Sequence, residues 1–142
     1  MIIRIRRMKK KKLTYSRQSV DQSDIRSVTK VLKSNYLTSG PIVKKFELKV
    51  SLITKSKYAV SSNSATSSLH IACLALGIKK NDIVWVPSIS FVATANCAAY
   101  CGAKIEFLDI DLNSFNINIF NLENKLKEAK KKKKIPKLIL VV

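Results

Sequence analysis

Residues 83–110 read IVWVPSISFVATANCAAYCGAKIEFLDI, and this stretch decides the class of fold. Ile83–Val86 is an apolar run closed by a proline, which predicts a short buried strand. Phe91–Tyr100 is rich in alanine and stops before a glycine, which predicts a helix. Lys104–Leu108 predicts the next strand. A strand, a helix and a strand in direct succession predict a parallel pair joined by a crossover helix.

The same alternation continues on both sides. Tyr58–Ser61 is expected to be a short strand, and Thr66–Leu76 a helix that ends at Gly77. Leu122–Lys133 has the composition of a polar helix, and Lys137–Val142 of a last strand. The fold class is therefore α/β, with a parallel-rich sheet and flanking helices.

Two helices are expected before this region. Asp21–Ser34 has apolar residues at the spacing of one helix face, and a second amphipathic helix is expected from Val43 to Ile53. Residues 35–41 between them are rich in turn-forming residues and predict a loop.

The chain has 27 lysine and arginine residues against 9 aspartate and glutamate residues, a formal net charge of +18. Such a charge raises the hypothesis of nucleic-acid binding, because clustered cations bind phosphate backbones. The clusters lie in residues 4–12 and in Lys130–Lys134, and no aromatic platform for bases lies among the other lysines. This distribution favours solvated surface lysines, so we expect no nucleic-acid partner.

Cys73, Cys97 and Cys101 lie in apolar stretches without further ligands at zinc spacing, so we expect buried thiols and no metal. Free thiols indicate a reducing compartment. The longest uncharged stretch, residues 83–103, is broken by polar residues, and the basic first residues precede no apolar signal core. We therefore expect a cytoplasmic protein with no membrane partner.

Ser61–Ser68 reads SSNSATSS and leads directly into a predicted helix. Ligands of α/β sheets bind at the carboxyl ends of strands, where such a segment would lie. Small residues, unpaired N–H groups and the positive end of the helix dipole suit a phosphate. Serine and threonine are also typical of an ordinary helix N-cap. The segment alone leaves both interpretations open.

Phe91 follows the next strand at the same edge of the predicted sheet. An aromatic side chain there can stack on a flat cofactor ring, although a lone phenylalanine is more often a core residue. The only glycines are at positions 40, 77 and 102, so the glycine-rich dinucleotide motif is absent. A classical NAD-binding domain is therefore disfavoured.

Several segments, in this order and spacing, resemble the DegT/DnrJ/EryC1/StrS family of pyridoxal-phosphate (PLP)-dependent sugar aminotransferases. They are Leu37–Pro41 (LTSGP), Asn63–His70 (NSATSSLH), Pro87–Asn96 (PSISFVATAN) and Gly102–Asp111 (GAKIEFLDID). The resemblance runs from about residue 13 to residue 142. It is greatest to the pseudaminic acid branch, whose members make UDP-4-amino-4,6-dideoxy-N-acetyl-β-L-altrosamine. The fold it implies is the large domain of fold-type I PLP-dependent transferases, as in aspartate aminotransferase.

The resemblance also implies roles for individual residues. Ala65 and Thr66 match the family's Gly-Thr pair, which holds the PLP phosphate. Phe91 matches the aromatic residue that stacks on the pyridine ring. Thr38 and Gly40 lie in a segment that the resemblance places near the nucleotide sugar. Alanine in place of glycine keeps the backbone N–H donors, provided that its φ is negative.

Three further residues are expected to have no catalytic role. His70 lies a turn beyond the start of its predicted helix, so we expect it in a packed or surface position. Asp109 and Asp111 match a family motif after a strand, which we interpret as structural.

The activity that the resemblance implies is transfer of an amino group from glutamate to the C4 keto group of a UDP-linked 4-keto-6-deoxy sugar. The product would feed pseudaminic acid or surface polysaccharide synthesis, and the enzyme would be a cytoplasmic homodimer. The family's pyridine-nitrogen aspartate and its Schiff-base lysine match no position up to Val142, so no catalytic residue is assigned. We expect residues 1–12 to be a disordered basic extension and residues 13–142 to be the N-terminal part of a truncated large domain, inactive by itself.

Two alternatives from other classes stay open. One is a small basic module that binds nucleic acid or an anionic membrane surface without catalysis. The other is a noncatalytic protein that binds PLP or phosphate.

Overall fold

The computed structural model describes Thr14 and residues 16–142, and the chain divides into two compact units, Met1–Tyr58 and Ala59–Val142. The expectation of a disordered extension over residues 1–12 lies outside the described residues.

The described residues of the first unit form two helices, α1 (Gln22–Leu32) and α2 (Pro41–Thr54), as the sequence predicted. Asp21 begins α1 with a capping box: its carboxylate accepts hydrogen bonds from the backbone N–H groups of Ser23 at 2.7 Å and Asp24 at 3.1 Å. The Asp24 carboxylate in turn accepts from the N–H of Asp21 at 3.0 Å. Three N–H groups that the helix cannot satisfy internally are thereby paired.

The second unit is built on a three-stranded parallel sheet, which confirms the α/β class. Its strands are β1 (Ile83–Pro87), β2 (Lys104–Leu108) and β3 (Leu138–Ile139), in the order β2-β1-β3. The central strand β1 is therefore hydrogen-bonded on both edges.

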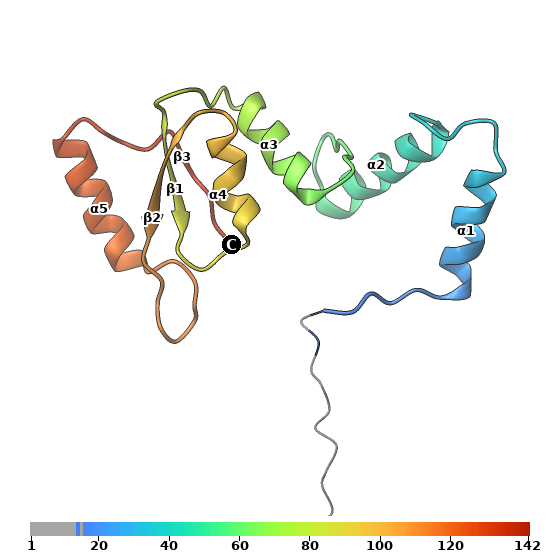
Figure 1. Ribbon diagram of the computed structural model, residues 1–142, viewed down its shortest axis with the longest axis horizontal. Coiled ribbons are helices and arrows are strands. Elements are labelled where there is room, and N and C mark those ends of the chain that lie inside the picture. The colour runs from blue at the N-terminus through green and yellow to red at the C-terminus, as the bar shows by residue number, and fades with distance from the viewer. Residues whose placement is uncertain (1–13, 15) are drawn as a thin grey trace, which may run out of the picture. The chain divides into compact units, whose positions relative to one another are not determined.

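Helices cover both faces of this sheet (Figure 1). One face packs against α3 (Ala65–Ala75) and α4 (Val92–Ala99), and the other against α5 (Ile119–Lys131). Side chains alternate across a strand, so Val84 and Val86 join the α3 and α4 cluster while Trp85 joins the α5 cluster. All three side chains are buried. Within the described part of the chain, no helix combines the length and the apolar character needed to cross a bilayer.

Lys125 of α5 lies over the Trp85 face of the sheet. Its ammonium is 4.7 Å from the centre of the Trp85 ring and 3.1 Å from the Glu106 carboxylate. It also donates a hydrogen bond of 2.9 Å to the carbonyl of Phe107. A half-buried lysine therefore fastens α5 to the edge strand β2 by several weak contacts.

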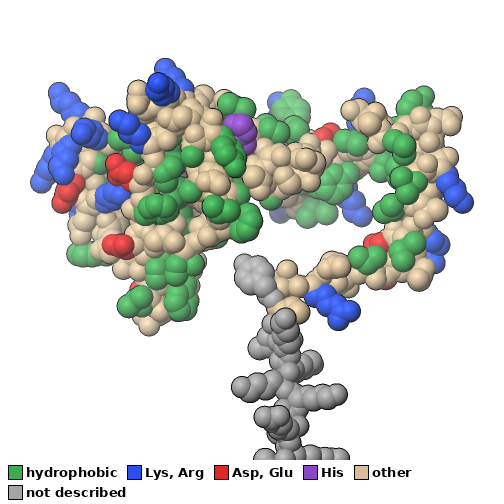
Figure 2. Space-filling model, in the orientation of Figure 1, with side chains coloured by type: hydrophobic (Ala, Val, Ile, Leu, Met, Phe, Trp, Pro, Cys, Tyr) green, Lys and Arg blue, Asp and Glu red, His purple; other side chains and the backbone are tan. Residues whose placement is uncertain are grey.

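The lysine run at the end of α5 forms a charged surface (Figure 2). Lys130 and Lys131 occupy the last turn of α5, where cations complement the helix dipole. Lys132 pairs with Glu128 across one turn at 3.5 Å, and both side chains are well exposed. This geometry is that of a solvated helix end.

One predicted strand is wrong. Tyr58–Ser61 forms no strand, and Tyr58 and Val60 are largely exposed. A strand exists only through hydrogen bonds to a neighbour, and none of β1, β2 and β3 pairs with this segment. The last strand is also shorter than Lys137–Val142: β3 contains only Leu138 and Ile139, although the N–H groups of Lys137 and Leu140 also donate to carbonyls of β1.

Candidate functional site

The first turn of α3 lies in the serine-rich segment. Ser64 is the N-cap, with its hydroxyl accepting a hydrogen bond from the N–H of Ser67 at 3.2 Å. The Ser64 carbonyl accepts the N–H of Ser68 at 3.0 Å, which is the first bond of the helix. The side chains of Ser62 and Ser68 are 2.6 Å apart and close the turn. The serines of this segment therefore form an N-cap, as one of the two interpretations predicted.

Ala65 and Thr66 keep unused donors at the same turn. Their backbone N–H groups have no acceptor among the described residues, and neither has the Thr66 hydroxyl. Ala65 is exposed and helical, without the positive φ that would favour glycine. The alanine that departs from the family pattern thus leaves both N–H groups available at the positive end of the helix dipole, where an anion binds favourably.

Phe91 occupies the N-cap position of α4, where the sequence predicted the start of a helix. It makes no capping hydrogen bond, and 71% of its surface is exposed. Its ring lines a cavity of about 260 Å³ at the carboxyl end of β1, together with Pro87, Ser88 and Phe107. A phenylalanine is a poor N-cap and gains little from burial here, so neither role accounts for it at this position.

Ser90 and Thr94 stand beside Phe91 and were not assigned from the sequence. The Ser90 hydroxyl donates a hydrogen bond of 2.5 Å to the Thr94 hydroxyl, and the Thr94 N–H donates to the Phe91 carbonyl at 2.9 Å. Thr94 is buried. The four-residue spacing of two hydroxyl residues at a helix start was the signal that could have identified this pair.

The helices that carry Ala65, Thr66 and Phe91 belong to one unit and pack against each other. The thiol of Cys73 in α3 meets the thiol of Cys97 in α4 at 3.6 Å. The rings of His70 and Tyr100 meet edge to face with centres 5.4 Å apart. His70 is half-buried by this contact, in the packed position expected for it.

Thr38 and Gly40 lie in the other unit, before α2. Thr38 is exposed, whereas Gly40 is the buried N-cap of α2. A methyl group added at Gly40 would lie 3.0 Å from Cβ of Tyr36 and 3.2 Å from its carbonyl oxygen. This close approach gives Gly40 a packing role, and sugar contact by either residue stays a prediction.

Asp111 has the structural role that was expected. Its carboxylate accepts the N–H groups of Asn113 at 3.0 Å and Ser114 at 2.9 Å. These bonds, the one from Ser114 first, hold the pKa of Asp111 below its ordinary value. Asp109 fixes the same turn through its carbonyl, which accepts the N–H of Asn118 at 2.9 Å. In Thr14 and residues 16–142, no three His, Cys, Asp or Glu side chains gather as a metal site would require.

Comparison with known proteins relates this geometry to a family. Residues 18–142 match the DegT/DnrJ/EryC1/StrS aminotransferase family. The chain is 47% identical over 114 residues to UDP-4-amino-4,6-dideoxy-N-acetyl-beta-L-altrosamine transaminase of Campylobacter jejuni, covering 80% of this chain and 30% of that protein.

Two solved structures show the same similarity in three dimensions. A DegT DnrJ EryC1 StrS aminotransferase of Brucella abortus has a TM-score of 0.75 and 30% identity, over 82% of this chain and 32% of that one. GDP-4-keto-6-deoxy-D-mannose-3-dehydratase of E. coli with bound hydrated PLP has a TM-score of 0.72 and 30% identity, over 77% of this chain and 30% of that one.

The chain thus spans about 30% of the length of the relatives it matches. The family predicted from the sequence motifs and the partial fold-type I domain are both confirmed. The chain belongs to the DegT/DnrJ/EryC1/StrS aminotransferase family.

Proposed function

We propose that this chain supplies the PLP phosphate site and ring platform of a nucleotide-sugar aminotransferase. The reaction is transfer of the amino group of glutamate to the C4 keto group of a UDP-linked 4-keto-6-deoxy sugar, in pseudaminic acid or surface polysaccharide synthesis. The similarity to the Campylobacter jejuni transaminase supports this choice of sugar. The enzyme would act as a cytoplasmic homodimer.

The observation that carries the proposal is the start of α3. The N–H groups of Ala65 and Thr66 and the Thr66 hydroxyl are three donors without an acceptor in the described chain. They lie at one helix end, behind the N-cap Ser64. These donors fit the PLP phosphate, which accepts several hydrogen bonds and carries negative charge.

Phe91 is the second element of the proposal. Phe91 is exposed and lines the cavity beside β1, so its ring offers a flat apolar face to an aromatic ring. Ser90 and Thr94 fix the turn from which it projects. Bound PLP would supply the electron sink for amino-group transfer, while these residues bind and orient it.

Amino transfer also needs a lysine nucleophile and an acid beside the pyridine nitrogen. No residue of this chain matches those positions of the family, so we propose that the chain binds PLP without catalysing transfer. This proposal for the chain itself corresponds to the alternative of a noncatalytic PLP-binding protein. The three donors at the start of α3 support it equally.

PLP binding tests the proposal directly. The chain is titrated with PLP by equilibrium dialysis, alongside Thr66→Val and Phe91→Leu. Each substitution is expected to weaken binding about tenfold or more, since a hydrogen bond to a charged group or a stacked ring is lost. Thr29→Val in α1 and Phe120→Leu at the exposed start of α5 are matched controls that should leave the affinity unchanged. Binding that all four variants retain would contradict the proposed site.

Borohydride reduction tests the absence of a catalytic lysine. Treatment of the PLP-loaded chain is expected to give no adduct at a single lysine in peptide mapping. The chain should also form no amino sugar from glutamate and the UDP-linked keto sugar. One specifically labelled lysine, or product formation, would show that this chain contains the nucleophile.

A further inference from the structure

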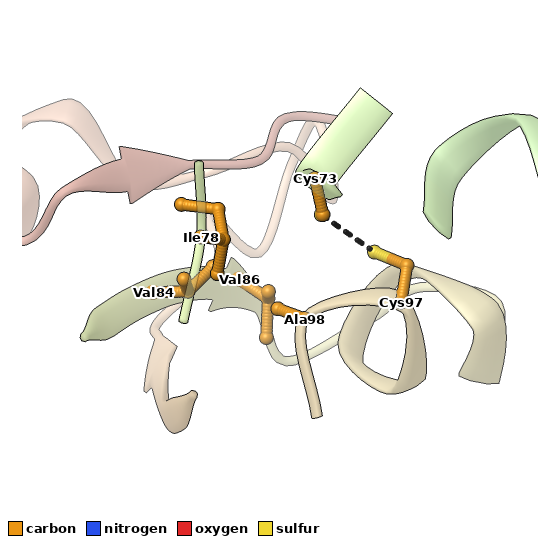
Figure 3. Close-up of a cluster of buried hydrophobic side chains, with 6 residues drawn as sticks. All are labelled: Cys73, Ile78, Val84, Val86, Cys97 and Ala98. Atoms are coloured by element: carbon orange, nitrogen blue, oxygen red, sulfur yellow. Dashed lines mark hydrogen bonds between the residues drawn. The ribbon is translucent and has the colours of Figure 1, made fainter. Parts of the chain in front are cut away.

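Two thiols from different helices face each other in the core of the second unit. Cys73 of α3 and Cys97 of α4 have their sulfur atoms 3.6 Å apart, and both are free cysteines (Figure 3). Only 1% of Cys73 and none of Cys97 is exposed. Neither thiol has a role in the function proposed above.

Hydrogen bonds orient the two sulfur atoms toward each other. The Cys97 thiol donates to the Thr94 carbonyl at 3.2 Å, within its own helix. Its lone pairs therefore remain for the Cys73 thiol, which donates across the helix interface. Val84, Val86 and Ala98 belong to the same cluster and lie to one side of the pair, so the cluster offers it no other polar side chain.

We propose that Cys73 and Cys97 are a disulfide-forming pair, which a two-electron thiol oxidant closes into a covalent link between α3 and α4. The two thiols lose two protons and two electrons, and a sulfur–sulfur bond replaces two S–H bonds. With a diazene oxidant such as diamide, the N=N bond accepts both electrons and both protons and becomes a hydrazine. The link joins the helix that begins at Ala65 to the helix that begins after Phe91.

Cys101 is the competing thiol, and its geometry disfavours it. It is half-buried in the turn that follows α4, and its S–H donates at 3.5 Å to the Cys97 carbonyl, four residues earlier. Its hydrogen therefore points along the backbone and not toward another sulfur. Folding consequently selects Cys73–Cys97 out of the three pairs that an unfolded chain could form.

The burial of the thiols also affects the rate of disulfide formation. Burial, followed by the hydrogen bond with Cys97, raises the pKa of Cys73 to about 12. The thiolate that attacks an oxidised sulfur is therefore scarce at neutral pH, and closure of the link is slow there. Closure should therefore become faster as pH rises, because the thiolate fraction rises.

The test oxidises the whole chain with diamide at pH 8.5 under native conditions and again in 8 M urea. Mass spectrometry under nonreducing conditions measures the loss of two hydrogens, and peptide mapping identifies the linked cysteines. We expect Cys73–Cys97 as the main product of the native chain and a mixture of pairs in urea. Cys101→Ser should form the same link, and Cys97→Ala should not form it.

The melting temperature gives a second, independent measurement. The link closes a loop of about 25 residues and should raise the melting temperature by roughly 10 °C, reversibly on addition of dithiothreitol. Three results overturn the proposal: no link in the native chain, a main product that contains Cys101, or the same mixture with and without urea. Because no cofactor is added, none of these results depends on whether the chain binds PLP.

Discussion

The ammonium of Lys137 donates a hydrogen bond of 2.9 Å to the carboxylate of Asp82. Lys137 immediately precedes β3 and Asp82 immediately precedes β1, so one ion pair joins the starts of two neighbouring parallel strands. The same ammonium donates to the carbonyl of Gly77 after α3, and Asp82 also accepts the N–H of Lys79 at 2.8 Å. This group of contacts fixes the entry of the central strand.

Replacing Lys137 with methionine should lower the melting temperature by several degrees. Methionine keeps the apolar stem but removes the charge, so the half-buried Asp82 carboxylate and the Gly77 carbonyl lose the ammonium that donates to both. Trp85, the only tryptophan of the chain, is buried and reports the transition by its fluorescence. Lys130→Met is the control: the Lys130 ammonium forms no ion pair with any described residue, so this variant should melt close to the parent chain. Equal melting of both variants would mean that the Asp82 contact contributes nothing.

Acid should reduce the difference in melting temperature between the parent chain and Lys137→Met, because the Asp82 carboxylate titrates and the Gly77 carbonyl does not. The hydrogen bond from Lys137, followed by the one from the Lys79 N–H, lowers the pKa of Asp82 from its ordinary value of 3.8. A carboxylate whose pKa is lower in the folded state adds stability above its unfolded pKa, and this contribution is lost as pH falls through the folded pKa. The melting temperatures should therefore differ fully at pH 6 and converge below about pH 4. A gap that persists undiminished at pH 2 would assign the stabilisation to the hydrogen bond from Lys137 to the Gly77 carbonyl, which acid does not remove.

The fold was predictable where neighbouring elements of the sequence pack against one another. The apolar run of β1, the alanine-rich helix α4 and the strand β2 follow one another and pair locally, and all were predicted. Tyr58–Ser61 has a similar local pattern but depends on a distant pairing partner, which no local pattern can supply. Its failure as a strand is therefore a failure of tertiary context and not of propensity.

The candidate site was predictable as a set of residue types but not as contacts. Small residues at a helix start indicated available N–H groups, and Ala65 and Thr66 have them. The meeting of Cys73 with Cys97, 24 positions apart, depends on how α3 crosses α4. A sequence pattern contains no information on that crossing, so the sequence predicted buried thiols but not which of them meet.

Substitution of Gly77 and of Gly102 by alanine can distinguish the energetic cost of a left-handed backbone from the cost of steric crowding. Gly77 and Gly102 both have positive φ, 67° and 77°. A methyl group at Gly102 would lie 3.3 Å from Cα and Cβ of Lys80, whereas at Gly77 the nearest atom is the flexible Lys137 ammonium at 3.9 Å. Alanine should therefore cost about 1 kcal/mol at Gly77, from the left-handed backbone alone, and more at Gly102. Urea unfolding followed by Trp85 fluorescence measures both, and a larger loss at Gly77 would contradict the crowding at Gly102.

The substitution Ser64→Asp can separate helix capping from phosphate binding at the start of α3. Aspartate is as good an N-cap as serine and its charge complements the helix dipole, so the melting temperature should stay the same or rise. The same carboxylate would stand beside the N–H groups of Ala65 and Thr66 and repel an incoming phosphate dianion. We therefore expect PLP affinity to fall at least tenfold in a protein that is not destabilised. Ser64→Asn keeps the cap without the charge and should bind PLP like the parent chain. If Ser64→Asp also bound PLP with parental affinity, the phosphate would have to lie away from this helix end. A phosphate bound there would be repelled by the added carboxylate.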